Sequence, residues 1–195
     1  MEVPAAFICE PLFFVFFLGI GFGFMLVEIS QMQRLIVFLG HPIYSLAVVL
    51  FSLLLSSGLG SFSTQKIINS PSFKAAGTRR MALLLSAIVV FGLLTPYVIS
   101  VFQGASTAMR IAISVIILCF LGFFMGMPFP LGMKMASAKS SQVTPWFWGI
   151  NGAASVCASV LAIVIALGSG ISTTFWTGFI CYIAAFLSFV YLARK

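Results

Sequence analysis

The sequence predicts an all-α, polytopic membrane protein with about six transmembrane helices. Hydrophobic residues make up 62% of its 195 residues and charged residues only 7%, whereas soluble domains carry about 25% charged residues. The mean hydropathy of +1.20 indicates a surface that lipid must solvate. The sequence contains several apolar runs of about 20 residues each, the length that crosses a bilayer, and short polar connections separate most of them.

We expect a single transmembrane domain over residues 1–195. Its six helices are predicted at approximately 11–34, 42–62, 81–102, 111–133, 145–167 and 171–192. Pro42 and Pro145 suit first helical turns, because proline lacks an N–H group that would have no intrahelical acceptor there. One connection, residues 63–80, is longer and basic. A solvated linker beside anionic lipid is the favoured interpretation, and a docking site for a cytoplasmic partner is the alternative.

The basic residues predict an orientation. With six helices, one side holds both termini and two connections, and it carries Lys66, Lys74, Arg79, Arg80, Lys134, Lys139, Arg194 and Lys195. The other side carries only Arg34 and Arg110. Eight basic residues against two is a strong positive-inside bias, so we expect both termini in the cytoplasm.

The shortage of ionisable side chains excludes several functions. The sequence contains no Asp, its acids are Glu2, Glu10 and Glu28, and its one histidine is His41. Two-carboxylate catalysis, multi-ligand metal sites and bis-histidine haem all lack the residues that they need. We therefore expect no enzyme activity, no metal and no cofactor. The basic residues lie between apolar runs rather than beside solvated aromatics, so we expect no nucleic-acid partner either.

A candidate polar site lies inside the membrane around Glu28. Counting from Pro11, a rise of about 1.5 Å per residue places Glu28 roughly 25 Å along the first helix. Gln31 follows at i+3 and can share its face, whereas Arg34 lies on another face and His41 lies in the turn before the second helix. An intramembrane carboxyl normally has a partner and is often functional. A proton or cation site and a structural polar clamp are equally good interpretations.

A second candidate site is a helix break or gate in the fourth helix. The segment 126–132 reads GMPFPLG, in which Gly126, Pro128, Pro130 and Gly132 oppose a continuous helix. Unwound backbone at membrane depth must be covered by protein or line a cavity. Asn151, near the start of the fifth helix, is expected on the same side. A gate or site wall and a simple helix end both explain the pattern, and the helix end is slightly favoured.

Two helix segments hint at an internal repeat. FFLGIGFGFM at residues 16–25 is similar to CFLGFFMGM at residues 119–127. Two halves of three helices each would run in opposite orientations, as in inverted-repeat transporters. We therefore add a 3+3 inverted-repeat, half-transporter-like bundle as a hypothesis.

Three longer stretches carry a family resemblance. GFMLVEISQMQRLIVFLGHPIYSLAVVLFSLLLSSGLGS (residues 23–61), GFFMGMPFPLGMKM (122–135) and PWFWGINGAASVCASVLA (145–162) resemble the membrane region of bacterial spermidine synthase-like membrane proteins. In that family, helices similar to half a transporter accompany a soluble aminopropyltransferase-like domain. This sequence has neither the Asp residues nor the strands of such a domain, so the resemblance implies the membrane part and not the activity.

We consider two functions, of which the resemblance implies the first, and the second rests on six helices being half of a common transporter size. The first is a non-catalytic subunit or detached half that anchors or serves a cytoplasmic aminopropyltransferase-like enzyme at the bacterial inner membrane. The alternative is a small homodimeric transporter of a cationic or amphiphilic metabolite. Expected partners are thus the lipid bilayer, that enzyme or a second copy of the chain.

Overall fold

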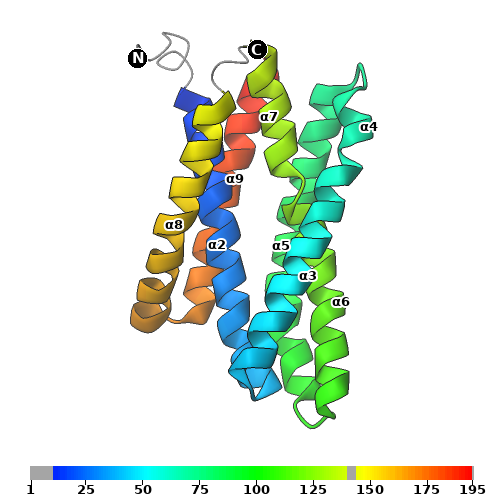
Figure 1. Ribbon diagram of the computed structural model, residues 1–195, viewed down its shortest axis with the longest axis vertical. Coiled ribbons are helices and arrows are strands. Elements are labelled where there is room, and N and C mark those ends of the chain that lie inside the picture. Colours follow the sequence, from blue (N-terminus) through cyan, green and yellow to red (C-terminus); the bar gives the residue numbers. More distant parts are fainter. Residues whose placement is uncertain (1–10, 140–143, 195) are drawn as a thin grey trace.

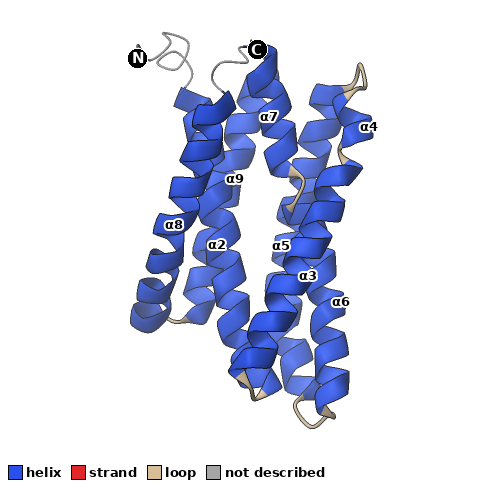
Figure 2. Cartoon of the chain, in the orientation of Figure 1, coloured by secondary structure: helices blue, strands red, loops and turns tan. Residues whose placement is uncertain are grey.

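The computed structural model describes residues 11–139 and 144–194, and every regular element in them is a helix (Figures 1 and 2). The elements are α2 (Pro11–Leu39), α3 (Pro42–Ser63), α4 (Gln65–Ile68), α5 (Phe73–Phe102), α6 (Thr107–Met125), α7 (Pro128–Lys139), α8 (Thr144–Ser169) and α9 (Ile171–Arg194). Six spans are long and apolar enough to cross a membrane, with α3–α4 and α6–α7 each counting as one. The predicted all-α membrane fold is confirmed.

The segment 63–80 differs from the expected linker. The short helix α4 occupies its middle, and α5 begins at Phe73 rather than near residue 81. The physical reason is its apolar content, since Ile67, Ile68 and Phe73 pack against the buried core. Burying these side chains stabilises the segment against the bundle, so most of it is helical, while Lys66, Lys74 and Arg79 stay exposed on it.

The helices form two groups. On one side, the central helix α2 packs most extensively against α9 and α8. On the other side, α3 packs against α6, and α5 joins the groups because it contacts both α9 and α6 (Figure 1). Sequence neighbours are therefore not always the main packing partners.

Glycines on α2 allow its close approach to both neighbours. A Cβ atom on Gly19 would lie 2.9 Å from the carbonyl oxygen of Cys181 on α9. A Cβ atom on Gly21 would lie 2.7 Å from the carbonyl oxygen of Asn151 on α8. Small residues give membrane helices their close backbone contacts, and here they hold α2 between α8 and α9.

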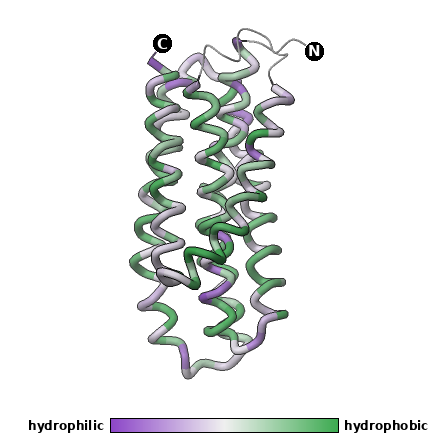
Figure 3. The backbone as a smooth tube through the Cα atoms, turned by 90° about the vertical axis from the view of Figure 1, so that its left-hand side faces the viewer, coloured by the Kyte–Doolittle hydropathy of each residue, from purple (hydrophilic) through white to green (hydrophobic). Residues whose placement is uncertain are grey.

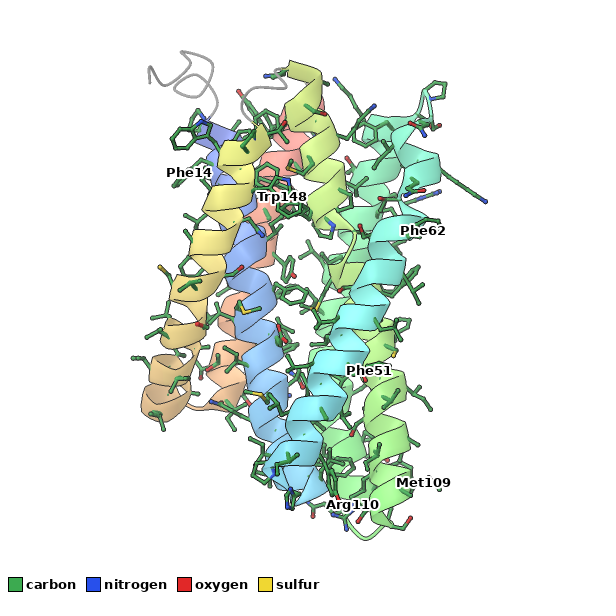
Figure 4. The ribbon with its side chains drawn as sticks, viewed as in Figure 1. Phe14, Phe51, Phe62, Met109, Arg110 and Trp148 are labelled. Atoms are coloured by element: carbon green, nitrogen blue, oxygen red, sulfur yellow. The ribbon has the colours of Figure 1, made fainter. Side chains whose placement is uncertain are left out.

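The two ends of the bundle differ in charge. The described basic residues of α4, the start of α5, α7 and the end of α9 lie at the end of the bundle where α2 begins and α9 ends, whereas Arg110 lies at the opposite end (Figures 1 and 4). Hydrophobic positions predominate between the ends (Figure 3). The structure thus keeps the charge separation read from the sequence, and the cytoplasmic placement of the lysine-rich end stays a prediction.

Candidate functional site

The fourth span is broken at Gly126 and Met127. The N–H of Gly126 still donates to the carbonyl of Gly122 at 3.0 Å, and the N–H of Met127 donates to the carbonyl of Phe124 at 3.2 Å. A new helix, α7, then begins at Pro128. Pro128 lies at its first position, where the N–H has no intrahelical acceptor anyway. The prolines therefore end α6 without costing α7 a hydrogen bond in its first turn.

A cleft of about 590 Å³ lies beside this break. Its walls come from α2, α3, the α6–α7 break, α8 and α9, and its exposed lining residues, Leu54, Gly58 and Trp148, belong to α3 and α8. Trp148, on α8, lies beside the gap between the two helix groups, toward the lysine-rich end (Figure 4). Its ring contacts Phe129 of α7 edge-on, with ring centroids 4.6 Å apart. This aromatic pair joins α7 to α8 at one end of the cleft.

The cleft is apolar with a few neutral polar groups. Its described polar lining residues are Ser57, Ser61, Asn151, Ser155 and Tyr182. Its described aromatic lining residues are Phe24, Phe129, Trp148 and Tyr182. Among the described residues, no Lys, Arg, His or Glu lines it. Apolar walls with a few fixed polar groups are the usual lining of small-molecule sites.

The structure brings four of the five candidate break residues together. Gly126, Pro128, Pro130 and Asn151 all line the cleft. Gly132 does not, because it is buried and a Cβ atom there would overlap the ring of Phe16. It therefore serves the packing of α7 on α2.

Sequence reasoning did not select Tyr182, although it lies deep in the cleft wall. Tyr182 on α9 is 1% exposed, and its ring would meet a Cβ atom on Gly23 at 2.8 Å. A lone tyrosine inside an apolar helix carries no periodic or motif signal. Only the packing of α9 on α2 reveals that it faces the cleft.

The residues around Glu28 do not form one cluster. Glu28 and Gln31 are 6% and 1% exposed, and Oε2 of Glu28 has no hydrogen-bond partner among the described residues. The Nε2 of Gln31 donates instead to Oγ of Ser30 at 3.4 Å, and Ser30 donates to the carbonyl of Val27 at 2.7 Å. A buried carboxyl without a partner is costly when charged. Glu28 is therefore a group that a proton or a bound cation would stabilise.

Arg34 and His41 lie apart from this carboxyl. Nη2 of Arg34 donates to Oγ of Ser172 on α9 at 3.1 Å, and its guanidinium carbon lies 5.4 Å from the centre of the Phe175 ring. His41 is exposed at the turn before α3, and its carbonyl accepts a hydrogen bond from the N–H of Ser45 at 3.2 Å. Arg34 thus joins α2 to α9, and His41 occupies a turn.

Arg110 makes two hydrogen bonds at the end of the bundle opposite the lysine-rich end (Figure 4). Its Nη1 donates to the carbonyl of Phe38 at 3.0 Å, and its Nε donates to the carbonyl of Ala105 at 2.8 Å. The first bond joins the start of α6 to the end of α2, and the second stays within the turn between α5 and α6. The two helix groups are therefore tied together at the end opposite the lysines.

The described residues contain no group of three or more His, Cys, Asp or Glu that could hold a metal ion. No protein-family model, curated protein or solved structure matches this chain. The resemblance drawn from the sequence accordingly stays a prediction, and the site rests on its own geometry.

Proposed function

We propose that this chain is a transporter-like membrane protein that binds a small amphiphilic molecule in the cleft beside the α6–α7 break. The observation that carries this proposal is the cleft itself, with its apolar walls, its neutral polar groups and its volume of about 590 Å³. Sites for small molecules typically measure about 300–1,000 Å³. Its exposed lining residues, Leu54, Gly58 and Trp148, lie within two membrane-spanning helices, so we expect a ligand to enter from the lipid.

The lining favours an amphiphile over a polyamine. A molecule with several ammonium groups needs carboxylates to replace its lost hydration. The described lining contains none, and Glu28 is not part of it. Phe24 and Trp148 can accept one positive charge through cation–π contacts. The expected ligand is therefore neutral or singly charged, with an apolar body.

The packing pattern supports a transporter-like arrangement. The first helix, α2, packs mainly against α8 and α9, the last two spans, whereas the fourth span, α6, packs against α3 and α5. Each half thus lends its first helix to the other half, as a two-fold relation between halves would require. A discontinuous helix beside the site is a second feature of such transporters. We include the 3+3 inverted repeat in the proposal on these grounds.

The subunit function implied by the resemblance is compatible with the same cleft. A cleft nearer the lysine-rich end could exchange a metabolite with a cytoplasmic aminopropyltransferase-like enzyme, and a second copy of the chain could cover its open side. Purification from the native membrane in mild detergent, followed by mass spectrometry, separates these assemblies. A stoichiometric enzyme supports the subunit, and a homo-oligomer supports the transporter.

A plug in the cleft tests the binding proposal. Gly58 lines the cleft, and a Cβ atom there would meet nothing within 4 Å, so Gly58→Phe can begin a side chain there, and we expect its ring to occupy the cleft. Gly152→Phe is the matched control, because Gly152 is equally open in its helix but does not line the cleft. The probe is radiolabelled tetraphenylphosphonium, an apolar ion with one positive charge.

The purified protein and the Gly152→Phe control should bind the probe, and Gly58→Phe should bind it at least about tenfold more weakly, a loss of roughly 1.4 kcal/mol. Excess unlabelled spermidine should not compete. Equal binding by both phenylalanine variants would remove the cleft from the proposal. Efficient competition by spermidine would instead show that a polyamine is the preferred ligand.

A further inference from the structure

Tyr182 presents a buried polar group to the cleft from a ring that is packed tightly in place. The side chain lies on α9, is 1% exposed and lines the cleft. Two of its ring carbons, Cδ2 and Cε2, lie 2.8 and 2.9 Å from the position that a Cβ atom on Gly23 of α2 would take. Because the ring packs directly on the backbone of α2, its hydroxyl has little freedom to move to another position.

The hydroxyl of Tyr182 has no hydrogen-bond partner among the described residues, and it is not fully enclosed by them. Since the rest of the side chain is buried and the residue lines the cleft, this hydroxyl opens into the cleft. The carboxyl of Glu28 does not accept its proton, and Oε2 of Glu28 is itself without a partner. A buried tyrosine hydroxyl normally has a partner, and leaving it unpaired is costly.

Two serine hydroxyls of the cleft differ from Tyr182 in this respect, because they already donate to backbone carbonyls. Oγ of Ser57 donates to the carbonyl of Leu54 at 3.1 Å. Oγ of Ser155 donates to the carbonyl of Asn151 at 2.9 Å. The remaining capacity of both serines is to accept, whereas Tyr182 offers an O–H donor that no described residue uses.

We propose that Tyr182 is a specificity-determining residue of the cleft and that its hydroxyl donates a hydrogen bond to an acceptor oxygen of the ligand. This inference rests on the proposed function, because it concerns the ligand of the same cleft. A ligand with such an oxygen pairs the buried hydroxyl, and a ligand without one leaves it unpaired. Sites that hydrogen-bond a ligand discriminate strongly against analogues that lack the matching group. The ligand class is thus an amphiphile that carries a carbonyl or a similar acceptor oxygen on its apolar body.

Two probes separate this hydrogen bond from apolar contact. Triphenylphosphine oxide carries a strong acceptor oxygen on an apolar body of phenyl rings, and tetraphenylphosphonium carries phenyl rings without an acceptor. Both are radiolabelled, and their binding to the purified full chain is measured by equilibrium dialysis, with protein-free micelles as the blank. The readout is the ratio of the two association constants, because a general change in the fold or in the volume of the cleft alters both.

One substitution and a matched control define the contact. Tyr182→Phe removes only the hydroxyl and should lower the ratio of oxide to phosphonium binding about fivefold, the effect of one neutral hydrogen bond. Tyr97→Phe makes the same change on α5, at a residue that is 68% exposed and does not line the cleft. It should leave the ratio unchanged.

The outcomes distinguish this inference from the proposed function. If tetraphenylphosphonium binds and Gly58→Phe weakens its binding, an unchanged ratio in Tyr182→Phe overturns the role of the hydroxyl and leaves the proposed function standing. If neither probe binds, the inference and the proposed function both fail. An equal fall of the ratio in Tyr97→Phe would also overturn the inference, because the effect would then not belong to the cleft.

Discussion

The α3–α6 contact and the cleft between α3 and α8 use the same residue type in opposite ways. Gly60 on α3 is buried in the contact, and a Cβ atom there would overlap the backbone of Phe123. Gly58, two residues earlier on the same helix, lines the cleft, where a Cβ atom would meet nothing within 4 Å. A glycine in a membrane helix therefore indicates close packing only where another backbone faces it.

Gly126 stands at the border between these two regions. Its Cβ position would overlap the backbone of Ser57, which places it in the α3–α6 contact, and it also lines the cleft. The contact thus ends where α6 ends. Beyond the break, α7 packs on α2 and α8, and the break itself lines the cleft.

The largest expected effect is a loss of stability when the α3–α6 contact is disrupted. Gly60→Val places a branched side chain against the Phe123 backbone, and overpacking of this kind costs about 3 kcal/mol. Gly58→Val, on the open side of the same helix, should change stability by no more than about 0.5 kcal/mol. Thermal unfolding in detergent measures both. Equal destabilisation by the two variants would contradict the distinction between contact and cleft.

The next prediction concerns the hydrogen bonds of Arg110, at the end of the bundle opposite the lysine-rich end. Arg110→Gln removes two hydrogen bonds from a charged donor to backbone carbonyls, which should cost about 2 kcal/mol. Hydrogen exchange should rise at residues 36–42, around the Phe38 carbonyl at the end of α2, and at residues 105–110, in the turn that leads into α6. Lys66→Gln at the opposite end is the control, with no change expected there. Unchanged exchange in Arg110→Gln would show that the turns close this end without the arginine.

A third prediction asks whether the buried carboxyl of Glu28 on α2 takes part in transport. Glu28 is buried outside the cleft, so Glu28→Gln should leave tetraphenylphosphonium binding unchanged. If the carboxyl exchanges a proton or cation during transport, uptake into proteoliposomes should fall at least about tenfold, or 1.4 kcal/mol. Full uptake by Glu28→Gln would assign this residue to helix packing instead.

The smallest expected effect lies in the cleft itself. Asn151→Ala removes a neutral polar lining group, which should weaken tetraphenylphosphonium binding about fivefold or less if the ligand contacts the amide. Ser159→Ala, at a half-buried position of the same helix that does not line the cleft, is the control, and it should bind the probe as the unmodified protein does. A larger loss with Ser159→Ala would point to a change in α8 as a whole rather than in the cleft.

Local sequence signals predicted the spans well and the site only in part. The apolar runs located all six spans, and the double-proline segment located the α6–α7 break, because both depend on neighbouring residues. The segment 63–80 was mistaken for a linker, because its few apolar residues gain their stability from the distant core. Tyr182 was missed for the same reason.

The membrane class, the six spans, the charge separation and the helix break are thus decided by composition and local chain chemistry. The thickness of the bilayer favours apolar runs of about 20 residues. Pro128 lacks the N–H that would continue the hydrogen bonding of α6, whereas the single Pro96 is accommodated inside α5. The tertiary structure alone decided that Gly58 faces a cleft while Gly60 faces a backbone, that Arg34 turns to α9 rather than to Glu28, and that the buried tyrosine of α9 lines the cleft. These features depend on which helix lies opposite, and helix partners are set by the packing of the whole bundle.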